Sequence, residues 1–362
     1  MLTAYVHGAS LDRSAQIVDR ILWETRGHTG SDMSHATLDR VLAVLVLAMA
    51  ATGLLSLRAG AADTAWVFTV HAVLGGSLLA ATFMKLRRSV PMAARAGRWR
   101  RLALGSIVSL GVVAALTGGF LWVASGELLT IGTWTVLTLH AWVGLLIAPL
   151  VVVHLLPHRW RVLKPPPRTG VSRRTVLAAG GLGLVGIGAF GLAGLTDRLR
   201  GGVRRFTGSR WLPTGGIPPV TTFFGEGTPS IDPDAWRLAV TTTTSRRELT
   251  LEALRALGET EIAAVLDCTS GWAIETGWRG VPLATLLDAT GIPASGYRAR
   301  VSITSVTGWS AVLTMEEARW AFLATGVGGV DLPAGNGAPC RLVVPGHRGL
   351  DWVKWVTEVR VA

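Results

Sequence analysis

Long apolar runs dominate the first 200 residues of the chain. Four of them are close to the roughly 20 residues that a helix needs to cross the hydrocarbon core of a membrane, and they lie at about 41–57, 65–84, 102–124 and 133–156. A fifth run, at 176–195, follows a basic, proline-rich segment. The pattern predicts four transmembrane helices and a fifth, anchoring helix.

The pattern changes from about residue 210. Apolar and polar residues now alternate over short segments that are separated by Gly and Pro turns, which predicts strands at 236–241, 297–304, 341–345 and 357–361. Patterns typical of short helices lie between them, at 250–257, 283–289 and 315–323. This mixture predicts an α+β domain.

Composition supports a membrane protein. Hydrophobic residues make up 49% of the chain and charged residues 16%, which is too apolar for an ordinary soluble domain. The net charge of +12 is uneven: residues 1–206 hold 22 Lys+Arg and 8 Asp+Glu, a net of +14, whereas the remaining residues hold 13 and 15, a net of −2. Because the excess accompanies the apolar runs, it indicates cytoplasmic loops and argues against a nucleic-acid partner.

The basic loops predict the orientation in the bilayer. Lys and Arg concentrate after the second and fourth helices, whereas the connections 58–64 and 125–132 hold one Arg, one Asp and one Glu between them. Cytoplasmic loops carry the excess of Lys and Arg. We therefore expect a multi-pass protein of the cytoplasmic membrane, with a cytoplasmic N-terminus and an extracytoplasmic domain after about residue 200.

Residues 1–32 show no clear periodicity, and we assign them no function. Met33 leads directly into the first predicted helix, which suggests that translation starts there; a short amphipathic tail is the alternative.

The fifth apolar run carries two short motifs. The segment 172–177, Ser-Arg-Arg-Thr-Val-Leu, resembles a twin-arginine export signal, although two ordinary positive-inside arginines are the alternative. Gly181, Gly183 and Gly186 spell a dinucleotide-binding pattern. Since no strand precedes them and the segment is apolar, we interpret these glycines as sites of close helix packing.

Histidines lie at two depths of the predicted bundle. His71, His140 and His154 lie within or at the end of spans, and His35 lies just before the first. Such groups are costly in lipid and often functional, although a hydrogen bond between helices is the alternative. His140 and His154 are 14 residues apart, about 21 Å along a helix and about 40° around it. They therefore share one face at two levels, as bis-imidazole ligation of two b haems requires.

The segment 33–160 resembles the four-helix dihaem cytochrome b subunit of formate dehydrogenases and related b561-type proteins. The resemblance implies that His71 and His140 hold an outer haem and that His35 and His154 hold an inner one. A weak internal repeat relates 69–72 to 138–141, but Lys85 stands where the first copy would match His154. The number of haems, one or two, therefore stays open.

Four ordered blocks carry a second resemblance. They are the segments 267–272, 278–283, 336–345 and 351–356. Together they resemble, over almost all of 215–362, the molybdopterin-binding domain of the sulfite oxidase family, which includes the periplasmic methionine sulfoxide reductases. The resemblance implies a molybdenum ion held by the dithiolene of one molybdopterin and by the thiolate of Cys268, a soft ligand of a suitable kind.

The same resemblance implies the other site residues. Contacts to Mo-molybdopterin are implied for Thr304, Asn336, Arg341, Trp352, Val353 and Lys354. Arg341 suits phosphate as a planar fork and Lys354 as a point charge. The alternatives for Cys268 are a buried free thiol or a disulfide with Cys340. We interpret Cys340 itself as a buried small hydrophobe.

The substrate stays open because the chain departs from the family. It ends at Ala362, without room for the dimerisation domain of true sulfite oxidases, and Thr221 to Phe224 stand where the sulfoxide reductases carry Asn and Tyr. His347 and Arg348 are candidates for the rim of the substrate pocket.

These expectations define a multidomain chain. It would comprise an N-terminal tail (1–32), an all-α transmembrane four-helix haem bundle (33–160), a basic linker with the fifth, anchoring helix (161–200) and an α+β sulfite oxidase-type molybdopterin domain (205–362). The expected function is a membrane-anchored molybdenum oxidoreductase that acts on a small S-oxide or related substrate and exchanges electrons with the quinone pool. The alternatives are a sulfite-dehydrogenase-like enzyme that donates to quinone and a metal-free sensor or anchor.

Overall fold

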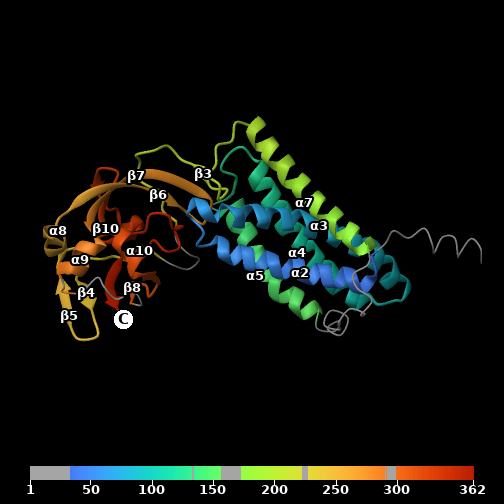
Figure 1. The fold of residues 1–362 in the computed structure, drawn as a ribbon, viewed down its shortest axis with the longest axis horizontal. Helices are drawn as coiled ribbons and strands as arrows, with labels where there is room; N and C mark the ends of the chain where they lie inside the picture. The colour runs from blue at the N-terminus through green and yellow to red at the C-terminus, as the bar shows by residue number, and fades with distance from the viewer. Residues whose placement is uncertain (1–32, 133, 156–172, 222–226, 290, 292–298) are drawn as a thin grey trace, which may run out of the picture.

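The structure is a computed structural model that describes residues 33–132, 134–155, 173–221, 227–289, 291 and 299–362. Long helices form a bundle at one end of the molecule, and the strands and short helices gather at the other end (Figure 1). A helical N-terminal region is thus followed by an α/β C-terminal domain.

Five helices of the described chain are long and apolar enough to cross a membrane. They are α2 (His35–Ser56), α3 (Ala65–Arg95), α4 (Trp99–Ala124), α5 (Val136–Leu155) and α7 (Arg173–Leu199). The five predicted apolar helices are therefore confirmed. The first helix starts earlier than predicted, because the Ser34 side chain accepts a hydrogen bond from the Thr37 amide and caps it. His35 is thus its first residue.

Close packing of α7 on α3 explains one of the glycines in the fifth apolar run. A Cβ atom on Gly186 would lie 2.2 Å from the Val73 carbonyl oxygen, and the Ser77 hydroxyl donates to the Leu182 carbonyl at 3.0 Å. Gly181 and Gly183 have no described atom within 4 Å of such a Cβ. The helix-packing interpretation is confirmed for Gly186.

The C-terminal domain contains two sheets. One has the order β11 (Val330–Asp331), β10 (Phe322–Val327), β7 (Trp272–Pro282) and β3 (Arg210–Trp211), with β12 (Arg341–Val343) paired to β10 and β6 (Thr260–Asp267) paired to β7. The other has the order β5 (Arg246–Leu249), β4 (Leu238–Thr241), β13 (Val356–Val361), β8 (Arg300–Ser305) and β9 (Ser310–Thr314). Their buried side chains form one hydrophobic core.

Short helices complete this domain. They are α8 (Leu251–Ala256), α9 (Leu283–Ala289), α10 (Met315–Trp320) and the 3-10 turn η3 (Ala334–Asn336). The predicted helix at 315–323 is too long: it starts at a capping box formed by Thr314 and Glu317, but Ala321 is extended and Phe322 begins β10. All six residues of β10 are buried, so sheet pairing outweighs the local helical pattern.

The two parts of the chain meet where α4 and α7 end and α5 begins. Thr135, just before α5, donates to the Ser270 carbonyl at 2.5 Å, and the Trp122 indole of α4 donates to the Gly208 carbonyl at 3.0 Å. Buried Asp197 near the end of α7 forms an ion pair with Arg210 of β3 at 2.6 Å. These contacts place the loop after β6 directly over the bundle.

Candidate functional site

One cavity of about 1840 Å³ extends from the helix bundle into the C-terminal domain. His71 and His140 line it in the bundle. Cys268, Arg341 and Lys354 line it in the C-terminal domain. The two groups of residues that the sequence singled out separately therefore face a common space.

Cys268 lies in a tight turn between β6 and β7. Its amide donates to the Trp272 carbonyl at 2.8 Å, and the Gly271 amide donates back to the Cys268 carbonyl at 2.9 Å. Gly271 has φ +101°, which glycine adopts without strain. The Cys268 sulfur lies 3.0 Å from the Ser270 hydroxyl and 3.4 Å from the Thr221 hydroxyl. The turn thus presents the thiol to the cavity among small polar groups.

Both cysteines are free thiols, so the alternative of a Cys268–Cys340 disulfide is wrong. Cys340 is fully buried in the hydrophobic core, and this burial raises the pKa of its thiol. A thiol in such surroundings is inert. The interpretation of Cys340 as a small hydrophobe is confirmed.

Arg341 provides a buried positive charge at the cavity wall. Its Nη1 donates to the Asn336 carbonyl at 3.0 Å, and its guanidinium lies 5.4 Å from the Trp278 ring and 5.8 Å from the Trp352 ring. Its Nε has no hydrogen-bond partner among the described residues. Burial lowers the pKa of Arg341 to about 10. A buried cation with an unused donor fits an anionic group such as the phosphate of a pterin cofactor.

Lys354 and Asn336 hold the loops around this end of the cavity. The Lys354 ammonium donates to the Thr221 carbonyl at 2.7 Å and to the Gly335 carbonyl at 2.8 Å. The Asn336 amide donates to the Pro218 carbonyl at 2.9 Å. Both side chains therefore fasten the segment before residue 222 to the η3 turn.

The predicted cofactor contacts differ in their access to the cavity. Trp352 lines it together with Arg341 and Lys354, whereas Asn336 and Val353 are not among the described lining residues. Thr304 is not among them either; the next residue, Ser305, lines the cavity. The alternation of side chains along β8 explains this one-residue offset.

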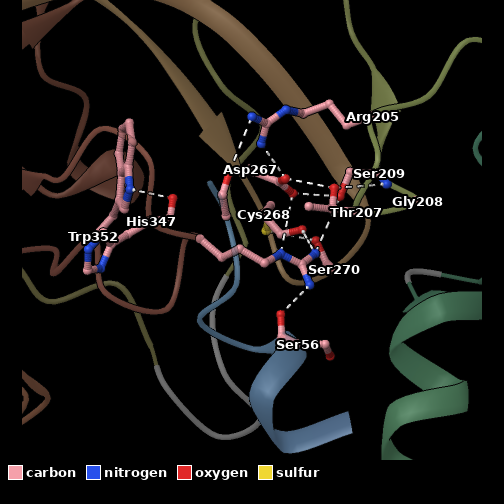
Figure 2. Close-up of polar contacts among 12 residues, drawn as sticks. Ser56, Arg205, Thr207, Gly208, Ser209, Asp267, Cys268, Ser270, His347 and Trp352 are labelled. Atoms are coloured by element: carbon pink, nitrogen blue, oxygen red, sulfur yellow. Dashed lines mark hydrogen bonds and ion pairs between the residues drawn. The ribbon is translucent and has the colours of Figure 1, made fainter. Parts of the chain in front are cut away.

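Figure 2 shows a polar network that the sequence did not reveal. The fully buried Asp267 carboxylate accepts hydrogen bonds from Arg205 at 2.6 Å, Thr207 at 2.7 Å and Ser209 at 2.6 Å. Asp267 belongs to the recognised block, but its partners precede it by about 60 residues. The network fixes the residue that immediately precedes Cys268.

The proposed pocket-rim residues lie where the two parts of the chain meet. Arg348 is buried, with 3% of its surface exposed, and it lines the same cavity as Cys268, whereas His347 is not among the described lining residues. His347 pairs in a β-bridge with Ala59 of the loop after α2. Its Nδ1 donates to Asp351 at 2.9 Å, and its Nε2 lies 3.5 Å from Glu317. Both residues therefore belong to the contact between the helices and the C-terminal domain.

This arrangement makes the stability of the folded C-terminal domain depend on pH. The hydrogen bond to Asp351, helped by the charges of Asp351 and Glu317, raises the pKa of His347, while burial and Arg58 act in the opposite direction. Since the folded-state pKa is raised, the stabilisation is complete below pH 6.5 and is lost as pH rises through the folded-state value. We expect the unfolding midpoint of wild type to exceed that of His347→Gln at pH 6 and to approach it at pH 9. A difference that grows with pH would contradict this.

His71 and His140 come together in the bundle. Their rings are 6.0 Å apart between centroids, with planes at 90°. The Thr52 hydroxyl donates to the Ala48 carbonyl at 2.7 Å, so it accepts from His71 Nδ1 at 2.9 Å. His140 Nδ1 donates to the Ala115 carbonyl at 2.7 Å. With Nδ1 protonated in both neutral rings, each Nε2 keeps a lone pair for a metal ion.

Glycines make room for these rings. A Cβ atom would lie 3.4 Å from the His71 ring if placed on Gly53, and 3.2 Å from the His140 ring if placed on Gly119. The donor set, the fixed tautomers and the adjoining cavity fit a haem iron held by two imidazoles. The structure thus pairs the two histidines that the sequence placed at the outer level.

The inner level is different. His35 is exposed at the start of α2, whereas His154 is half-buried, with its ring close to Gly105 of α4. Lys85, which replaces a histidine in the internal repeat, forms an ion pair with buried Asp39 of α2. The inner pair of haem ligands therefore stays a prediction.

Comparisons with known proteins address the C-terminal domain. Residues 225–362 match the family model described as the oxidoreductase molybdopterin-binding domain. The chain is similar to the protein-methionine-sulfoxide reductase catalytic subunit MsrP of Xanthomonas axonopodis pv. citri, with 33% identity over 129 residues, 30% of this chain and 38% of that protein. MsrP of Gluconobacter oxydans is 35% identical over 113 residues, 26% of this chain and 36% of that protein.

A solved structure gives a weaker likeness. The sulfane dehydrogenase SoxCD of Paracoccus pantotrophus aligns with a TM-score of 0.35 and 25% identity, over 37% of this chain and 40% of that chain. The chain spans less than two fifths of the length of the MsrP relatives. The residues that match the family model include Cys268 and the blocks around it. The C-terminal part of this chain is thus a molybdopterin-binding domain of the sulfite oxidase type, similar to that of MsrP.

Proposed function

We propose that the chain is a membrane-anchored molybdopterin-dependent oxidoreductase that transfers an oxygen atom to or from sulfur in a small substrate outside the cytoplasmic membrane. One or two b haems would exchange electrons with the quinone pool. The observation that carries this proposal is the single cavity, because it is lined by the His71–His140 pair and by Cys268. A redox chain needs its carriers close together.

The residues of the C-terminal domain would each hold one part of the cofactor. The Cys268 thiolate would bind molybdenum, and Arg341 would bind the phosphate of the pterin. Lys354 would keep the loops that enclose the cofactor in place through the Thr221 and Gly335 carbonyls. When bound, the molybdenum centre supplies two-electron oxygen-atom transfer.

The histidines of the bundle would hold the haems. His71 and His140 would bind the outer one through Nε2, and His35 and His154 the inner one. Thr135 lies five residues before His140 and donates to the Ser270 carbonyl. The Ser270 hydroxyl in turn lies 3.0 Å from the Cys268 sulfur. Direct contact between α5 and the Cys268 turn supports electron exchange between the two sites.

The proposed orientation can be tested separately. The distribution of Lys and Arg favours an extracytoplasmic C-terminal domain. We expect a reporter that is active only outside the cytoplasm, such as alkaline phosphatase, to be active when fused after Ala362. Alkaline phosphatase activity only in fusions to the connection between α3 and α4, residues 96–98, would reverse the orientation.

The full-length protein, purified in detergent, tests the function. We expect about one molybdenum per chain, a b-type reduced-minus-oxidised spectrum and reduction of an S-oxide by reduced quinone analogues. S-oxides, N-oxides and sulfite should be compared in one panel. Turnover of sulfite alone, with reduction of quinone, would favour the sulfite-dehydrogenase-like alternative. Matured protein without molybdenum would favour a sensor or anchor.

A further inference from the structure

Three chain segments lie side by side above the bundle. The segment 347–349 forms a β-bridge with Ala59 on one side and, through Arg348, a parallel bridge with Asp267 on the other. The Gly349 amide also donates to the Asp267 carbonyl at 2.8 Å. The segment 347–349 therefore lies between the loop after α2 and Asp267, as a strand lies between its two neighbours in a sheet.

Gly60 allows the close approach of this loop. A Cβ atom at this position would lie 2.6 Å from the Gly346 carbonyl oxygen and 2.8 Å from the Arg348 amide nitrogen. Because both are backbone atoms, a larger residue would push the loop away from the segment 347–349. The helical region and the C-terminal domain are thus fitted to each other at the backbone level.

The Arg348 side chain connects all three segments. Its Nη1 donates to the Ser56 carbonyl at the end of α2 at 3.0 Å, and its Nη2 donates to the Cys268 carbonyl at 3.1 Å. Its guanidinium also lies 5.6 Å from the ring of Phe68, three residues before His71 on α3. One planar side chain therefore donates hydrogen bonds to the end of α2 and to the backbone of Cys268. It also lies near an aromatic ring of α3, the helix that carries His71.

Electrostatics favours a cation at this position. The last carbonyls of α2 lack partners within the helix and carry its negative dipole end. The Asp267 carboxylate adds a negative charge, with its Oδ1 3.5 Å from Arg348 Nε. Lysine would bring the same charge but a single ammonium, which cannot hold two carbonyls in the geometry of the planar fork.

We propose that Arg348 is a positioning residue that sets the orientation of the Cys268 thiolate relative to the outer ends of α2 and α3. The inference rests on the proposed function, because it concerns the thiolate as a molybdenum ligand. If Arg348 has this role, the metal site is complete only when the C-terminal domain is packed against the helices. Separation of the C-terminal domain from the helices would then alter the surroundings of the molybdenum, while the Cys268 ligand would stay in place.

The test compares Arg348→Lys with Arg58→Lys in the full-length holoenzyme. Arg58 is the matched control, because it lies at the same contact and faces Asp351 at 3.6 Å, yet its side chain is 68% exposed. We expect Arg348→Lys to keep molybdenum and the b-type spectrum, to change the molybdenum EPR spectrum and to lower kcat roughly ten- to a hundredfold, with KM little changed. Arg58→Lys should match wild type in all five measurements.

Gly60→Ala is the second variant, and it leaves Arg348 intact. By displacing the loop it should change the EPR spectrum in the same direction, which keeps the proposal testable if Arg348→Lys fails to accumulate. Wild-type spectra and kcat in Arg348→Lys, or in Gly60→Ala, would overturn the inference, and so would equal changes in both arginine variants. Wild-type protein without molybdenum would overturn the proposed function, and this inference with it.

Discussion

Cys268→Ser is expected to remove molybdenum from the purified protein and to lower turnover by more than about a hundredfold. Even the outer-shell partners of a metal ligand are worth 10- to 100-fold in affinity or activity, and this change removes the ligand itself. A serine hydroxyl is a hard donor that stays protonated near neutral pH, whereas the site requires a soft thiolate. Metal analysis and steady-state turnover measure the two effects.

Cys340→Ala is the matched control for this prediction. Cys340 lies 72 residues further along the chain, fully buried in the core of the same domain. Its removal should cost some stability through a small cavity but leave molybdenum in place. Stoichiometric molybdenum in Cys268→Ser, or its loss in both variants, would show that the metal is not held by the Cys268 thiolate.

His140→Ala is expected to remove at least half of the b-type absorbance. The variant deletes one of two rings that are 6.0 Å apart and leaves the Ala115 carbonyl without its donor. A haem that loses one of two axial ligands changes its spectrum and binds more weakly. The reduced-minus-oxidised difference spectrum of detergent-purified protein measures the loss.

Two further histidine variants complete the experiment. His347→Gln lies outside the bundle and should leave the absorbance unchanged. His154→Ala distinguishes one haem from two: an inner haem predicts a partial loss that adds to the loss in His140→Ala. An unchanged spectrum in His140→Ala would remove the assignment of the bundle as a cytochrome.

The helices and four of the strands could be predicted from local pattern. Apolar runs of membrane-spanning length correspond to α2, α3, α4, α5 and α7, and the alternating segments correspond to β4, β8, β12 and β13. The strand β10 was missed, because its sequence continues the pattern of α10 and its burial comes from pairing with β7 and β12. Such pairing depends on residues far along the chain.

The candidate site could be predicted in its chemistry but not in its assembly. The blocks around Cys268 and Arg341 carried the resemblance, and helical geometry placed His71 level with His140. In the structure, the Thr52 hydroxyl binds Nδ1 of His71 and the Ala115 carbonyl binds Nδ1 of His140, which leaves Nε2 of each ring available. Helix spacing could not reveal these partners, because they lie on other helices.

The sequence by itself determined which segments are long and apolar enough to cross a membrane, which fold into a mixed domain and which residue types could bind metal and phosphate. These properties follow from local hydrophobicity, periodicity and short motifs. Only the tertiary structure decided that Cys268 and the histidine pair line one cavity and that Arg348, which also lines it, joins the C-terminal domain to the end of α2. Arg348 and Ser56 are 292 residues apart, and contacts over such distances arise from the packing of whole elements, which no local pattern records.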